Sequence, residues 1–338
     1  MRSWIVAALA CSGCVLSEGV GDPFESQGPR GQPTTTAGSP WEGAAPRGLT
    51  MAARLPLVLD ELVLLPDGLQ GHAIMASEAI EGGDGVYTCA FGTVTGDVTD
   101  DRDLSAFGGF EGVVDAGWFH DEETTVSVTD DTVGFLEHVG DGAFRVRDSL
   151  ALEGVVGVAV WNEGWVGLRS DGYGDCQVER YLAHATQPAE VHTLAGPCGD
   201  RPDVEVNADG DAWFVHGGQV YAWSAGSAPI GIAEARSVAW TGRGVAIADA
   251  RGVRVVGGVA TPLDGRVRQV LAVGGLPAFV AVGARLDGSG AAWLVDARDG
   301  TIVDTLFLPD GDGSVAAARD VGLFAVSGQE VTLIQVGL

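Results

Sequence analysis

The chain has 338 residues, 46% of them hydrophobic, and it carries 46 acidic against 19 basic residues, a formal net charge of −27. An acidic excess of this size repels phosphate backbones and anionic lipid surfaces, so it excludes nucleic-acid binding. The apolar content is ample for a large core, and no run approaches the ~18 apolar residues of a membrane span.

The first fourteen residues have the composition of a secretory signal. Arg2 supplies a positive charge, a short apolar stretch follows, and small residues precede Cys11 and Cys14. The sequence Ser12-Gly13-Cys14 resembles the lipobox of bacterial lipoproteins, whose cysteine is diacylated and becomes the mature N-terminus. The resemblance implies a lipid anchor on Cys14, or alternatively on Cys11, and an extracytoplasmic place in the cell envelope, at the outer membrane or cell surface. An ordinary cleaved signal with incidental cysteines is the other interpretation.

Residues 15–53 are rich in Gly, Pro, Ser and Thr and include a run of three threonines. A segment of this composition buries too little apolar surface to offset the entropy that it loses on ordering. We expect it to be a flexible tether between the membrane anchor and a single folded domain at residues 54–338.

The domain is built from short runs in which apolar and polar residues alternate, separated by Gly- and Asp-rich pairs. The clearest copy begins at residue 203 and predicts four strands joined by tight turns in roughly forty residues. Asp-Gly and Gly-Gly pairs supply the positive φ values that hairpin turns need. A four-stranded unit repeated at this period is typical of a β-propeller.

The repeat indicates an all-β, seven-bladed β-propeller. The units begin near residues 72, 113, 155, 203, 237, 270 and 315. Six or eight blades are alternatives, because the fourth strand of the first unit is poorly marked.

The last unit has only three strands, while an additional strand at residues 62–65 precedes the first unit. The sequence around it is similar to that of residues 306–311, which form an outer strand by position. We therefore predict that residues 62–65 pair with residues 331–336 and close the ring, which leaves no open sheet edge at the seam.

Two hairpins resemble repeats of known propeller families. Residues 209–221, with Asp-Gly-Asp-Ala-Trp-Phe-Val, are similar to the two-component-regulator type of repeat, and residues 292–303 are similar to the quinoprotein and WD40 types. These resemblances cover single hairpins. They imply the fold and assign no functional residue.

Nothing in the spacing of the chemically reactive residues indicates an enzyme. The sequence contains no HExxH motif, no zinc-type spacing of Cys and His, and no GxSxG motif. We expect no catalytic residue, cofactor or metal. The histidines are scattered over four units: His72, His120, His138, His184, His192 and His216.

One acidic run is a candidate calcium site, because Ca²⁺ takes six to eight oxygen ligands. It comprises Asp97, Asp100, Asp101 and Asp103. Solvated turns on an acidic protein are the alternative explanation.

Cys176 and Cys198 flank a predicted hairpin whose tip lies near residue 187, midway between them. A symmetric antiparallel register places the two cysteines opposite each other, within reach of a disulfide, and export permits its oxidation. We predict this disulfide, which leaves Cys89 as a buried thiol.

The expected function is that of a membrane-tethered, monomeric binding or scaffold module for a protein or glycan partner. The alternative is an extracytoplasmic hydrolase or lyase with its site at the central channel. Small apolar residues on the expected innermost strands, at residues 155–160, 238–239 and 315–318, favour the scaffold.

Overall fold

The computed structural model describes most of the chain beyond residue 44. The described residues are 45–55, 59–67, 71–78, 84–90, 93–97, 115–119, 124–128, 132–140, 143–199, 202–273, 276–308, 315–318, 323–327 and 331–337.

Within these residues every element is a β-strand, and the strands form seven antiparallel sheets. Three sheets hold the strands β2(Leu59–Asp67), β3(Gly71–Glu78), β4(Asp84–Ala90) and β5(Thr93–Asp97); β6(Asp115–Phe119), β7(Thr124–Val128), β8(Thr132–Gly140) and β9(Ala143–Ala151); β10(Val155–Trp161), β11(Gly164–Ser170), β12(Cys176–Leu182) and β13(Glu190–Leu194).

The remaining sheets follow the same consecutive order, apart from the last one. They hold β14(Val204–Val206), β15(Ala212–His216), β16(Gln219–Trp223) and β17(Ile230–Glu234); β18(Ser237–Trp240), β19(Val245–Asp249) and β20(Gly252–Val255); β21(Gly265–Ala272), β22(Ala278–Arg285), β23(Gly290–Asp296) and β24(Ile302–Leu308); and, in the order β1-β27-β26-β25, β1(Gly48–Leu55), β27(Val331–Gly337), β26(Leu323–Ser327) and β25(Val315–Ala318).

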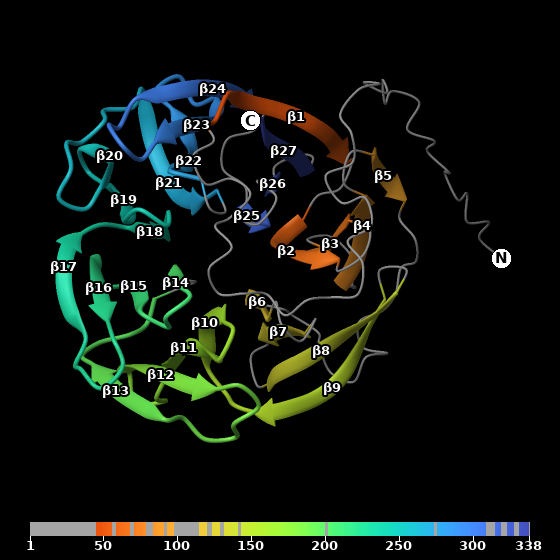
Figure 1. The fold of residues 1–338 in the computed structure, drawn as a ribbon, viewed down its shortest axis with the longest axis vertical. Helices are drawn as coiled ribbons and strands as arrows, with labels where there is room; N and C mark the ends of the chain where they lie inside the picture. The colour runs from red at the N-terminus through yellow and green to blue at the C-terminus, as the bar shows by residue number, and fades with distance from the viewer. Residues whose placement is uncertain are drawn as a thin grey trace.

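The sheets stand around a common centre, as Figure 1 shows, and the fold is that of a β-propeller. The first strand of each consecutive sheet lies innermost. These strands touch in the order β2, β6, β10, β14, β18, β21 and β25, and β25 touches β2. The rim carries the last strands, among them β13, β17 and β24 (Figure 1).

The turn of the clearest sequence copy, at residues 207–211, illustrates why the strands end where they do. The Asn207 side-chain oxygen accepts hydrogen bonds from the backbone N–H groups of Asp209 (3.0 Å) and Asp211 (2.8 Å). Gly210 adopts a φ of 80°, which an L-residue rarely does. The Asn-Ala-Asp-Gly-Asp segment therefore forms the turn between β14 and β15 from its own side chains.

The hydrophobic core consists of layers between neighbouring sheets. One layer joins the sheet of β10 to that of β14 and includes Trp161, Val178 and Phe214, all buried. Side chains that follow one another along a strand enter different layers: Val158 packs with Trp165, whereas Ala159 packs with Trp161. Each sheet thus buries both of its faces, which explains the nearly continuous apolar runs of β11 and β23.

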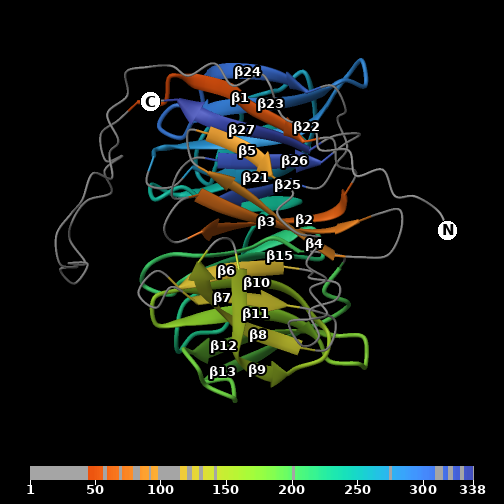
Figure 2. The same ribbon diagram turned by 90° about the vertical axis from the view of Figure 1, so that its right-hand side faces the viewer.

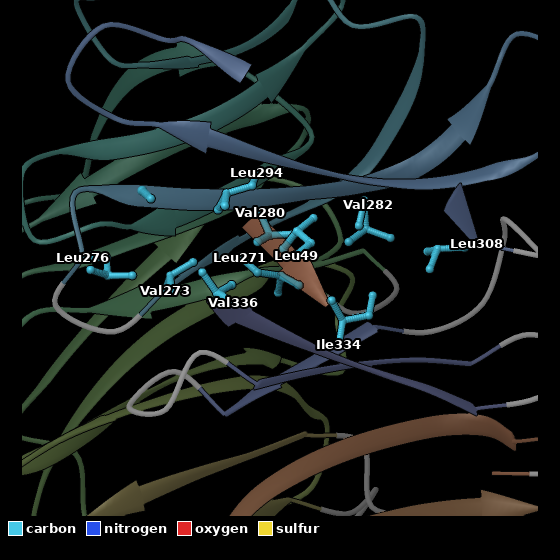
Figure 3. Close-up of a cluster of buried hydrophobic side chains, with 12 residues drawn as sticks. Leu49, Leu271, Val273, Leu276, Val280, Val282, Leu294, Leu308, Ile334 and Val336 are labelled. Atoms are coloured by element: carbon cyan, nitrogen blue, oxygen red, sulfur yellow. The ribbon is translucent and has the colours of Figure 1, made fainter. Parts of the chain in front are cut away.

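The N-terminal strand β1 pairs with the C-terminal strand β27, in a register that runs from Gly48 opposite Gly337 to Leu55 opposite Val331. Figure 2 shows this pair beside β24, at the end of the molecule opposite β9 and β13. Leu49, Ile334 and Val336 pack on Val280 and Leu294 of the adjoining sheet (Figure 3).

Two expectations are therefore wrong. Residues 62–65 do not pair with residues 331–336, because they belong to β2, which pairs with β3 and is the innermost strand of its sheet. The pairing with β27 is made instead by β1, which begins at Gly48 inside the segment that was expected to be a tether. The similarity between residues 62–68 and 306–311 reflects strand composition that inner and outer strands share.

Among the residues that the structure describes, there is no helix with the length and apolarity needed to cross a membrane.

Candidate functional site

The most developed polar arrangement ties the starts of two neighbouring inner strands, β14 and β18, to the middle of a third, β21. Asp203 immediately precedes β14, Ser237 is the first residue of β18, and Gln269 lies in β21. The strands β14 and β18, and β18 and β21, are direct neighbours around the centre. We call the end of the molecule at which the innermost strands begin the starting end.

One carboxylate and one hydroxyl hold this arrangement. Asp203 Oδ2 accepts hydrogen bonds from the Ser237 hydroxyl and from the Val238 backbone N–H (3.1 Å), and Asp203 Oδ1 accepts one from Gln269 Nε2 (3.3 Å). The Ser237 hydroxyl oxygen in turn accepts the backbone N–H of Val270 at 2.8 Å. Three sheets are thereby joined through a single chain of hydrogen bonds.

This hydrogen-bond network has a structural role. Ser237 is 1% exposed, and its hydroxyl both donates and accepts within the network, so it is not presented as a nucleophile. The nearest candidate base along the chain, His216, lies at the end of β15, where its Nε2 is 3.0 Å from the carbonyl oxygen of Ala195. What the arrangement can do is fix the positions of three blades at the starting end.

The small apolar residues expected on the innermost strands do lie there, in β10, β18 and β25. Of those whose side chains are described, Val158, Ala159, Val238 and Ala239 are at most 5% exposed and pack into the layers between sheets. Their role is to let neighbouring inner strands approach closely.

A second tie, which the sequence analysis missed, joins the sheet of β10 to the sheet of β14. Arg180 of β12 is 4% exposed, and its guanidinium lies 5.4 Å from the ring centre of Trp161 and 4.5 Å from that of Trp223. It donates hydrogen bonds to the carbonyl oxygens of Gly210 and, at 3.5 Å, Trp223. Burial lowers the pKa of Arg180 from its usual value. The signal in the sequence was a Glu-Arg pair inside a predicted strand.

Arg180 is flanked by a carboxylate with its own partners. Glu179, 2% exposed, accepts hydrogen bonds from Arg169 Nε (2.9 Å) and from the Tyr181 hydroxyl (2.6 Å). Burial and this hydrogen bond raise the pKa of Tyr181 well above its usual range. The pair with Glu179 raises the pKa of Arg169. The charge of Glu179 is therefore neutralised by Arg169 of the adjacent strand in the same sheet.

The structure contains the Cys176–Cys198 disulfide, with the two Cα atoms 4.7 Å apart. The register behind the prediction was wrong, however. Cys176 pairs with Leu194, so Cys198 lies beyond the end of β13. Positive φ values at Gly196 (91°) and Gly199 (87°) accompany the return of the chain toward Cys176.

Several predicted sites lie wholly or partly outside the described residues. Cys11 and Cys14 are outside them, as are Asp100, Asp101 and Asp103 of the calcium candidate, whereas Asp97 ends β5. Cys89 lies in β4, and its side chain is not among those described. Over the described part of the chain, no group of three or more His, Cys, Asp or Glu side chains is arranged to hold a metal ion.

Comparisons with known proteins support the fold but identify no family. No family model matches the sequence, and no curated protein matches it either. Among solved structures, a chain of the mitotic checkpoint complex is similar over 94% of this chain and 99% of its own length, with 13% identity and a TM-score of 0.50. Hsv2 of Kluyvelomyces marxianus is similar over 64% of this chain and 69% of its own, with 10% identity and a TM-score of 0.47. At these identities the likeness concerns the β-propeller fold alone.

Proposed function

We propose that this protein is a binding scaffold: a propeller that presents the turns of its starting end to a partner. We further propose that its seven sheets are the blades of a closed ring, that Cys14 carries lipid, and that the N-terminal segment holds the ring outside the cytoplasm at a membrane surface. The basis for the anchor is the lipobox resemblance of residues 12–14.

The observation that carries the scaffold proposal is the character of the starting end. In a sheet of consecutive antiparallel strands, the turn between the second and third strands lies where the first strand begins; Val155 is opposite Arg169, and Gly265 is opposite Arg285. Two such turns expose large apolar side chains, Tyr173 (96%) and Leu286 (87%). The network of Asp203 fixes the inner strands beneath this end. Exposed apolar groups on rigidly held turns favour a protein-binding surface.

Site-directed photo-crosslinking in the encoding organism tests the proposal. A benzophenone amino acid replaces Leu286 at the starting end or, as the control, Leu182, which is 55% exposed at the opposite end of its sheet. We expect a discrete adduct with one protein from position 286 and none of comparable yield from position 182. Equal yields, or turnover of ester or glycoside substrates by the purified protein, would contradict the scaffold.

The anchor has its own test. Intact-mass analysis of Cys14→Ala and Cys11→Ala variants, expressed in a bacterial host, identifies the lipidated cysteine. We expect the acyl mass to disappear with Cys14→Ala and to persist with Cys11→Ala.

A further inference from the structure

The turn between β11 and β12, at residues 171–175, is held by its own hydrogen bonds, like the turn at residues 207–211. Asp171 Oδ1 accepts the backbone N–H groups of Tyr173 (2.7 Å) and Asp175 (3.1 Å), and the Asp171 N–H bonds to the Asp175 carbonyl oxygen (3.0 Å). The base of the turn is thus closed on itself, and its conformation does not depend on a partner.

The same turn is fastened to the segment that leads toward the next sheet. Asp175 Oδ1 accepts the Gly196 backbone N–H at 2.8 Å, and the next residue, Cys176, is bonded to Cys198. A covalent bond and a hydrogen bond therefore secure the C-terminal side of the turn, while the pairing of Ser170 with Cys176 secures its base.

At the apex of this fastened turn stands an aromatic residue in open space. Tyr173 is 96% exposed, between Gly172 (φ 77°) and Gly174 (φ 102°). Apart from the glycine itself and its chain neighbours, no heavy atom lies within 4 Å of the position that a Cβ would take at either glycine. Asp171 and Asp175 close the turn, the disulfide of Cys176 holds it in place, and the two glycines allow its backbone conformation. The Tyr173 ring has no such structural task.

We propose that Tyr173 is the anchor of the partner site, and that the partner is a protein segment that lays an arginine on its ring. This inference rests on the scaffold function proposed above. Aromatic side chains with few rotatable bonds are frequent binding hot spots, and holding one in place before binding lowers the entropy lost on association.

The choice of a cationic protein segment follows from the surrounding charge. Asp171 and Asp175 lie two residues before and after Tyr173, and the whole chain carries a net charge of −27, which attracts basic segments. The neighbouring Arg169 does not oppose this, because it is paired with Glu179 and also bonds Gln177 at 2.8 Å. A guanidinium stacks on an aromatic face and carries a charge that a neutral glycan lacks.

Fluorine NMR of the full chain tests the assignment. The sequence has four tyrosines, so protein labelled with 3-fluorotyrosine contains four reporters, and Tyr173→Phe identifies the resonance of interest. The probes are decapeptides of alternating glycine with arginine, lysine or citrulline, and maltohexaose as a neutral glycan, at about 0.15 M salt to screen general attraction.

We expect the Tyr173 resonance to shift saturably with the arginine peptide, less with the lysine peptide, and not with the citrulline peptide. Tyr173→Ala should weaken binding of the arginine peptide about two- to five-fold, as loss of an exposed cation–π contact does. The matched control, Leu182→Ala, removes an exposed apolar side chain from the opposite end of the same sheet and should leave the affinity unchanged.

Three results would overturn the inference: no saturable shift of the Tyr173 signal, an equal affinity in Tyr173→Ala, or a saturable shift with maltohexaose in place of the arginine peptide. If any of these occurs while position 286 still crosslinks to one protein, the anchor is wrong and the scaffold function stands. If crosslinking at position 286 also fails, the scaffold function itself is wrong.

Discussion

Two regions of the propeller hold their blades together by different means. At the seam, where the first and last described strands meet, β1 pairs with β27, and aliphatic side chains such as Leu49 and Ile334 pack on the sheet of β21. The described hydrogen bond between the two sheets there runs from the Leu49 N–H to Asp304 Oδ2 (2.8 Å). Between β10 and β21, by contrast, the sheets are joined by a disulfide-pinned segment, a buried arginine and a hydrogen-bonded carboxylate.

The difference follows from how each region is connected. The blades between β10 and β21 are already joined by short chain segments. Their additional contacts therefore fix the relative positions of these blades at the starting end more than they hold the blades together. No such segment joins β1 to β27, because β1 lies near the start of the described chain and β27 lies at its end. The seam is held together by backbone pairing and apolar burial, which stabilise it strongly but do not depend on specific side-chain partners.

The largest effect is expected from removing the seam strand. Deletion of residues 45–55 takes away the whole of β1 and exposes the edge of β27 together with its apolar cluster. We expect loss of the cooperative thermal transition in circular dichroism and increased binding of a hydrophobic dye. Deletion of residues 15–40, in the predicted tether, is the control and should leave the transition unchanged. A sharp transition in the first variant would show that the fold does not need this strand.

The sequence did not reveal β1, and the reason is physical. Residues 48–55, Gly-Leu-Thr-Met-Ala-Ala-Arg-Leu, are neither rich in β-branched residues nor regularly alternating, so only the open edge of β27 makes them a strand. Residues 62–65 are far more strand-like and occupy an inner position instead. The other units were readable because their turns carry Asp-Gly and Gly-Gly pairs between alternating runs.

The site was less predictable than the fold, for the same reason. The disulfide pairing was accessible because both cysteines belong to one unit, but its geometry depends on the returning segment after β13, which the strand pattern does not encode. The bond between Asp203 and Ser237 joins different units, 34 residues apart, and no local pattern marks it.

The next largest effect concerns the covalent tie. Replacing Cys176 and Cys198 together by alanine should lower the free energy of unfolding by about 3 kcal/mol, the chain-entropy value for a loop of this size. Urea unfolding monitored by tryptophan fluorescence measures the change, and Cys89→Ala is the control. Wild-type protein treated with a reductant should match the double variant. An unchanged midpoint would mean that the remaining contacts alone hold the segment after β13.

A smaller effect should follow from Ser237→Ala, which breaks the bond to Asp203 and leaves the buried Val270 N–H without its acceptor. We expect a loss of about 1–3 kcal/mol in urea unfolding. Ser227→Ala, on an exposed turn, is the matched control and should cost less than about 0.5 kcal/mol. Hydrogen exchange should speed up at β18 and β21 but not at β1, because the seam does not share this network. Faster exchange at both would show that the two regions are coupled.

The smallest effect should come from the ion pair of Asp296 at the end of β23, in the sheet next to the seam. Its partner Arg298 is two residues away, donating to Asp296 Oδ1 from the backbone N–H (2.8 Å) and from Nε (2.9 Å), so the pair closes a turn and does not join sheets. These hydrogen bonds lower the pKa of Asp296. A carboxyl whose pKa is lower in the folded state stabilises the fold above its unfolded pKa of about 4, and the contribution disappears as the pH falls through the folded value.

Asp296→Asn should therefore lower the stability at pH 7 by less than about 1 kcal/mol and flatten its decline between about pH 5 and pH 3. Urea unfolding across this range measures both, with Arg298→Ala expected to produce the same change. A loss at pH 7 as large as that of Ser237→Ala would mean that this turn supports the seam after all.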